Sequence, residues 1–140
     1  MNPKSLYRAA LLEYLFYASL TADPAEASAA YRTYRQLARK GCPDGWFGLG
    51  RARQYGYGAK PNHAKAEKYY HRAAELGHAE SQEALGYLYE KGLGLPKNYA
   101  KAHKWYARAA LQADATACNN LGFLYYNGKG VHRSKKLAKK

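Results

Sequence analysis

The chain has 140 residues, which is enough for one domain with a modest core or for a short stacked array. Its formal net charge of +13 would attract nucleic acid, an anionic membrane surface or an acidic protein. The two cysteines, Cys42 and Cys118, have no Cys-x-x-Cys spacing, which argues against a disulfide framework and against a thiolate zinc site. We therefore expect a reducing compartment and a cytoplasmic protein.

The first segment, MNPKSLYRAALLEYLFYASLTADP, has to be distinguished from an export signal. Glu13 and three tyrosines interrupt its apolar run, no small-x-small cleavage pattern follows, and the run is shorter than the roughly 18 residues of a membrane span. We expect an amphipathic helix over residues 6–20. Asp-Pro-Ala-Glu at 23–26 then predicts an N-cap and a second helix over 24–40, ending at Gly41. Residues 1–40 would thus form a divergent N-terminal capping pair.

The rest of the chain repeats itself with a period of 36 residues. Leu-Gly occurs at 49–50, 85–86 and 121–122, and Gly-x-Gly at 56–58, 92–94 and 128–130. Ala-Lys-Ala, an aromatic pair and Ala-Ala then occur at 64–66, 69–70 and 73–74, and again 36 residues later. Self-similarity at a fixed period indicates stacked structural units. We predict units at 41–76, 77–112 and 113–140, the last one truncated and ending in a basic tail.

Each unit is predicted to contain two helices. In the middle copy the first helix covers about residues 79–90 and stops at Gly92, because glycine readily adopts the left-handed conformation of a C-cap. Asn98, after Pro96, is the expected N-cap of the second helix. Helical spacing places an apolar set on one face of that helix: Ala102, Trp105, Tyr106, Ala109 and Ala110. In the third copy the first helix is expected over about 115–126.

These residues resemble the Sel-1-like repeat, a relative of the tetratricopeptide repeat. The middle copy carries the pattern most fully, at Leu85, Gly86, Tyr89, Gly92, Gly94, Lys101, Ala102, Trp105, Tyr106, Arg108, Ala109 and Ala110. The first copy departs at Arg53 and Tyr69, where the family has Tyr and Trp, and the third ends soon after Val131. The resemblance covers about residues 41–138. It implies an all-α solenoid of antiparallel helix pairs in a right-handed superhelix, a non-enzymatic protein–protein interaction scaffold, and a bacterial source.

One predicted binding surface lies on the first helix of each pair, which usually lines the concave side of such a stack. The residues left free there at helical spacing are Phe47, Arg51, Gln54, Glu83, Tyr87, Glu90, Asn119, Phe123 and Tyr126. Aromatic anchors among mixed charges suit a peptide or helix of a partner protein, an acidic one included. The alternative that these aromatics pack against adjacent repeats stays open.

A second predicted surface is basic. Its residues are Arg32, Arg35, Arg39, Lys65, Lys68, Arg72, Lys101, Lys104 and Arg108, with Lys135 and Lys136 in the tail. Each helical trio lies opposite the Ala/aromatic face, so stacking would draw a positive stripe along the convex side. A solvated face explains much of this pattern, since the family pattern itself carries Lys near two of these positions. Ala64 and Ala100, however, replace an acid common in the family, so the alternative function is electrostatic binding of nucleic acid or another anionic surface.

The sequence predicts no enzyme, no cofactor and no metal. Each Gly-x-Gly follows a predicted helix rather than a strand, which argues against nucleotide binding. His63, Glu67 and His71 share one side of a helix, but a closed zinc site usually needs four ligands. No nucleophile–base arrangement can be defined. Self-association is a third alternative, through apolar surface near Phe123 and Leu124 in the truncated repeat.

Overall fold

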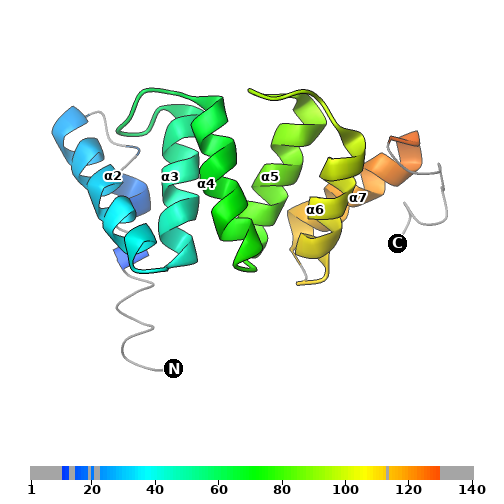
Figure 1. Ribbon diagram of the computed structural model, residues 1–140, viewed down its shortest axis with the longest axis horizontal. Helices are drawn as coiled ribbons and strands as arrows, with labels where there is room; N and C mark the ends of the chain where they lie inside the picture. Colours follow the sequence, from blue (N-terminus) through cyan, green and yellow to red (C-terminus); the bar gives the residue numbers. More distant parts are fainter. Residues whose placement is uncertain (1–10, 13–14, 19, 21–22, 113, 130–140) are drawn as a thin grey trace. The chain divides into compact units, whose positions relative to one another are not determined.

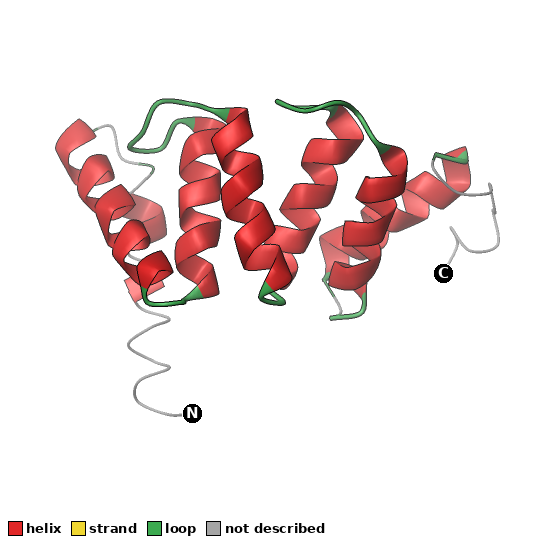
Figure 2. Cartoon of the chain, in the orientation of Figure 1, coloured by secondary structure: helices red, strands yellow, loops and turns green. Residues whose placement is uncertain are grey.

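The computed structural model describes residues 11–12, 15–18, 20, 23–112 and 114–129. These residues form helices and loops, with no strand among them (Figures 1 and 2). The helices are α2 (Pro24–Arg39), α3 (Pro43–Tyr55), α4 (His63–Glu75), α5 (Ala79–Lys91), α6 (Tyr99–Ala110) and α7 (Ala115–Asn127). Of the helix predicted over 6–20, residues 11–12 and 15–18 are helical, and most of the others lie outside the described part. The chain divides within α4 into two compact units, residues 1–69 and 70–140.

Short-range hydrogen bonds begin these helices where the sequence predicts. The Asp23 carboxylate accepts a bond of 3.0 Å from the backbone N–H of Ala25 at the start of α2. The Asn98 side chain accepts from the N–H of Lys101 at 2.9 Å at the start of α6. Such caps satisfy N–H groups that have no partner within the helix. The two predicted N-caps are therefore confirmed.

Glycines end three of the helices. The residues that follow α3, α5 and α7 are Gly56, Gly92 and Gly128, with φ of 80°, 69° and 67°. A side chain would be strained at these angles, whereas glycine adopts them easily. The Gly-x-Gly motifs are thus helix C-caps, and the observed helix ends differ from the predicted ones by a single residue in α5 and α7.

In the first unit, α2 packs against α3 around a small core. The ring of Tyr34 lies against Gly48, where a Cβ atom would overlap it. Leu49 and Ala52 of α3 and Ala30 of α2 belong to the same buried cluster. Small residues on α3 therefore let the two helices approach closely enough to enclose a tyrosine ring.

In the second unit, α6 packs against both α5 and α7. The buried cluster consists of Ala102, Tyr106, Ala109, Ala117 and Leu124. A Cβ added to Gly86 of α5 would lie 2.7 Å from two ring carbons of Tyr106, so glycine is required for this contact. The predicted apolar face of α6 is confirmed, with Trp105 4% exposed and Ala110 partly buried.

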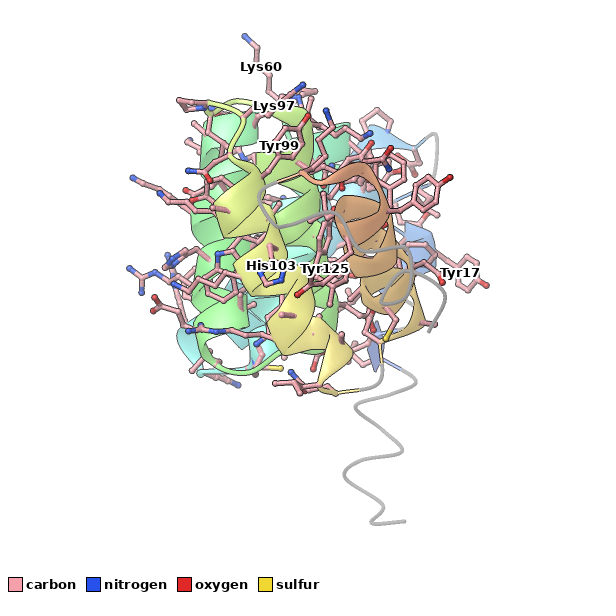
Figure 3. All side chains as sticks on the ribbon, turned by 90° about the vertical axis from the view of Figure 1, so that its right-hand side faces the viewer. Tyr17, Lys60, Lys97, Tyr99, His103 and Tyr125 are labelled. Atoms are coloured by element: carbon pink, nitrogen blue, oxygen red, sulfur yellow. The ribbon has the colours of Figure 1, made fainter. Side chains whose placement is uncertain are left out.

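A polar pair also joins α6 to α7 nearer the surface. The ring of His103 and the phenol ring of Tyr125 face each other edge-on, with centroids 5.4 Å apart (Figure 3). His103 Nε2 lies 2.9 Å from the Tyr125 hydroxyl oxygen, which is hydrogen-bonding distance. The contact adds a specific polar link to a mostly apolar helix interface.

Candidate functional site

The predicted groove residues of the first unit are largely engaged within the chain. The guanidinium of Arg51 lies over the rings of Phe16 and Phe47, at 4.5 and 4.6 Å from their centroids. This is the geometry of a cation–π contact, so Arg51 and Phe47 satisfy each other. Gln54 is only 9% exposed, and the expectation that it is free on the surface is wrong. It stands 36 residues before Glu90, and both are buried at the same position of the repeat.

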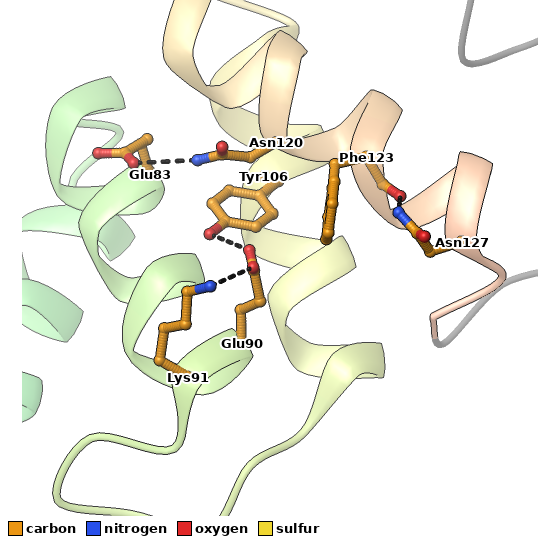
Figure 4. Close-up of polar contacts among 7 residues, drawn as sticks. All are labelled: Glu83, Glu90, Lys91, Tyr106, Asn120, Phe123 and Asn127. Atoms are coloured by element: carbon orange, nitrogen blue, oxygen red, sulfur yellow. Dashed lines mark hydrogen bonds and ion pairs between the residues drawn. The ribbon is translucent and has the colours of Figure 1, made fainter.

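In the second unit, Glu90 is also buried, and the expectation of a free side chain is wrong for it as well. Its side chain is 8% exposed and accepts a hydrogen bond of 2.8 Å from the hydroxyl of Tyr106 (Figure 4). The other carboxylate oxygen lies 3.4 Å from the ammonium of Lys91. A buried carboxylate needs such partners, and the tyrosine of the neighbouring helix supplies one. Periodicity along α5 alone does not show this bond.

The remaining predicted residues of the second unit form a surface on α5 and α7. Three aromatic side chains are exposed there, Tyr87 at 37%, Phe123 at 54% and Tyr126 at 47%, and Asn119 is exposed with them. Glu83 is half-buried. We call this surface the α5–α7 face, defined by Glu83, Tyr87, Asn119, Asn120, Phe123 and Tyr126.

Asn120, which the sequence interpretation did not select, joins the two helices of this face. Its side-chain amide on α7 donates to a carboxylate oxygen of Glu83 on α5 at 3.3 Å (Figure 4). The two residues are 37 positions apart, so they occupy almost the same place in successive repeats. This offset of nearly one repeat was the feature of the sequence that could have identified the contact between Asn120 and Glu83. The bond links the Glu83 carboxylate to α7, where the exposed Phe123 follows Asn120 by about one helical turn.

The electrostatics of this face differ in sign from the chain as a whole. Burial raises the pKa of Glu83 to about 7, and the nearby carboxylates of Asp114, Glu80 and Glu90 add to the rise. The hydrogen bond from Asn120 opposes it. Four of the ten acidic residues of a protein with net charge +13 thus gather around one position.

Leu124 does not contribute to an exposed apolar surface. It is fully buried, in contact with the cluster around Tyr106, because α6 covers that side of α7. The expectation of an exposed patch at Leu124 is therefore wrong, while its neighbour Phe123 points outward and is 54% exposed.

The predicted basic residues on the described helices are all exposed: Arg32, Arg35, Arg39, Lys65, Lys68, Arg72, Lys101, Lys104 and Arg108. Lys135 and Lys136 lie outside the described residues. On α6 the ammonium of Lys104 and the guanidinium of Arg108 lie 5.3 and 4.7 Å from the ring centroid of Trp105. Helix α6 contains no acidic residue. Its outer surface is therefore positive, with two cations supported by one indole.

The described residues contain no group of three side chains arranged to hold a metal ion. In the candidate set on α4, His71 lies 3.4 Å from Glu75 and packs edge-on against Trp105. Cys42 and Cys118 do not form a disulfide with each other. None of the described helices has the length and apolar character needed to cross a bilayer.

Comparison with known proteins explains the 36-residue period. A family profile described as "Sel1 repeat" matches residues 47–78, 79–114 and 115–140. Comparison with curated proteins finds no match.

Solved structures share the fold. A protective antigen of uropathogenic Escherichia coli with an SLR fold is 34% identical, with a TM-score of 0.77, over 79% of this chain and 24% of its own. A Sel1 repeat protein of Oxalobacter formigenes is 31% identical, with a TM-score of 0.78, over 99% of this chain and 58% of its own. Helicobacter pylori cysteine rich protein B is 28% identical, with a TM-score of 0.64, over 85% of this chain and 84% of its own. The chain thus spans less than two thirds of the first two proteins.

All three relatives are bacterial, as the resemblance suggests for this chain. The described helices and these neighbours confirm an all-α solenoid of the Sel1 and tetratricopeptide-like class. With the family profile matching most of its length, the chain belongs to the Sel1 repeat family.

Proposed function

We propose that this chain is an adaptor that holds a peptide or helix of a partner protein on the α5–α7 face. Sel1 repeat proteins are in general non-enzymatic scaffolds that bind other proteins. The observation that carries the proposal is the exposure of Tyr87, Phe123 and Tyr126 together on two neighbouring helices. Exposed aromatic side chains are typical anchors for a docked segment. We place this adaptor in the cytoplasm, a proposal supported by a chain with just two cysteines that do not pair.

Peptides selected from a random 12-residue display library test this function. We expect Tyr87→Ala and Phe123→Ala each to weaken binding of the selected peptides about tenfold, because each removes an anchor. The matched control is Lys101→Glu with Lys104→Glu, which should change affinity less than about twofold at 150 mM salt. Fluorescence anisotropy of labelled peptides gives the dissociation constants, and circular dichroism checks the fold. Affinity that depends on the lysines and ignores both aromatics would contradict the proposal.

The second candidate function is electrostatic binding of nucleic acid, and the acid-free positive surface of α6 favours it. If Lys101, Lys104 and Arg108 neutralise about three phosphates, affinity for a mixed-sequence oligonucleotide should fall about 40-fold between about 50 and 200 mM salt. Fluorescence anisotropy with labelled DNA and RNA measures this, with the Lys101→Glu and Lys104→Glu variant as the control for the surface. Absence of binding at the lower salt concentration would exclude this candidate.

A further inference from the structure

We propose that the segment recognised by the α5–α7 face is basic, with a lysine or arginine that pairs with the carboxylate of Glu83 beside the rings of Tyr87 and Phe123. This inference rests on the proposed function and specifies the chemistry of the partner. It is the opposite of what the net charge of +13 suggests, since the chain as a whole would attract acidic segments.

The α5–α7 face carries one carboxylate on the same two helices as its exposed aromatic anchors. Glu83 and Tyr87 are four residues apart on α5 and therefore lie on the same side of that helix. Asn120 holds Glu83 from α7 at 3.3 Å, and Phe123 lies one turn beyond it. Within the described part of the chain, the bond recorded for Glu83 uses one carboxylate oxygen, and the second oxygen can bond to an incoming cation. A residue with a long aliphatic stem and a charged end can contact the rings and the carboxylate together.

The charges packed around Glu83 favour a cation. Glu80, Glu90 and Asp114 all interact unfavourably with its ionised form, in addition to the cost of its burial. One cation near these carboxylates is Lys91, which lies 3.4 Å from Glu90 and 6.0 Å from the ring centroid of Tyr87. Lys91 is thus already paired with Glu90, and its position shows that the Tyr87 ring accommodates a positive charge.

Screening by salt determines whether a ligand on the α5–α7 face responds to the acidic residues around Glu83 or to the net positive charge of the chain. The Debye length at physiological ionic strength is about 8 Å, so charges elsewhere on the chain are screened from a ligand in contact with the face. A cation next to Glu83 reduces the repulsion among the surrounding carboxylates. Because Glu83 is half-buried, the attraction between its carboxylate and the cation is stronger than it would be in bulk water. An acidic residue in the same place would add to the repulsion.

The charge of the selected peptides tests the inference. We expect peptides enriched from the random 12-residue library to carry a net positive charge together with an aromatic or aliphatic residue. At pH 8, Glu83→Gln should weaken the binding of these peptides about tenfold, because glutamine keeps the shape and the bond to Asn120 but removes the charge. The matched control is Glu75→Gln, an exposed carboxyl outside the face, which should leave affinity unchanged. The Glu83→Gln variant is expected to be at least as stable as the wild type, so unfolding would not account for a loss.

The possible outcomes separate the two proposals. Enrichment of acidic or neutral peptides whose binding still requires Tyr87 and Phe123 would overturn the basic partner and leave the adaptor function in place. Basic peptides whose affinity is the same for Glu83→Gln and the wild type would overturn the pairing with Glu83. Peptides indifferent to both aromatics, or no enrichment at all, would overturn the adaptor function and the inference together.

Discussion

Replacing Tyr106 with phenylalanine should lower the free energy of unfolding by about 2–3 kcal/mol, although the change removes a single oxygen atom. The hydroxyl donates to Glu90 at 2.8 Å, and both side chains are buried. Without the Tyr106 hydroxyl, the Glu90 carboxylate retains the ammonium of Lys91 at 3.4 Å but loses its hydrogen-bond donor inside the core. A buried acceptor that loses its donor costs more than an ordinary hydrogen bond contributes, because its desolvation is no longer offset. Urea denaturation followed by circular dichroism measures the change.

The repeat supplies a matched control in Tyr34, which is 2% exposed and lies 72 residues earlier at the same position of the repeat. The residue 16 positions before Tyr34 is Ala18, where Tyr106 has Glu90, so no acceptor occupies that place. Among the described residues the Tyr34 hydroxyl makes no hydrogen bond of good geometry, although the guanidinium of Arg51 interacts with it. Tyr34→Phe should therefore cost less than about 1 kcal/mol, clearly less than Tyr106→Phe, because no buried carboxylate loses its donor. Equal losses in the two variants would show that the bond to Glu90 contributes nothing specific.

Replacing Glu83 with glutamine should stabilise the protein above pH 7 and have little effect near pH 4. The pKa of Glu83 is raised from 4.5 to about 7 in the folded state, first by burial and then by its acidic neighbours. The folded protein therefore binds this proton more tightly than the unfolded chain does. Its stability falls as the pH rises from about 4.5 through 7, where folding must ionise a disfavoured carboxyl. Glutamine does not ionise, so we expect the variant to be more stable at pH 8 by about 1–3 kcal/mol.

The measurement is urea denaturation of the wild type and Glu83→Gln at pH 4, 6 and 8. The difference between the two proteins should grow with pH, which separates ionisation from a general effect of the substitution. Glu75→Gln, on the exposed end of α4, should stay within about 0.5 kcal/mol of the wild type at each pH. A constant difference between the wild type and Glu83→Gln across this range would contradict the raised pKa.

These two predictions concern neighbouring residues with different roles. The Glu90–Tyr106 pair stabilises the contact between α5 and α6 and is covered by protein. Glu83 lowers stability at neutral pH and remains partly accessible on the α5–α7 face. A residue that costs stability without supporting the core is typical of a site kept for binding. This contrast agrees with placing the partner's charged group at Glu83.

The amino-acid sequence by itself was sufficient to predict the fold class and, to within one residue, the bounds of α2, α5 and α7. Gly92 and Asn98 end α5 and begin α6 through backbone angles and bonds that span three or four residues, so a short window contains all the information. The 36-residue period then indicates stacking, because each helix pair needs a neighbour to bury its apolar face. The buried face of α6 follows from helical spacing for the same local reason.

Only the tertiary structure determined which of the residues predicted to be free on the first helix of each pair are accessible to solvent. Helical spacing identifies the side of a helix on which a residue lies, but it does not state how close the next helix comes. Gly86 brings the ring of Tyr106 against α5, and this close approach encloses Glu90 with Tyr106. The packing of α7 on α6 buries Leu124. The bond that encloses Glu90 and the bond that links Glu83 to α7 join residues 16 and 37 positions apart. Such pairings depend on distances between helices that no local pattern encodes.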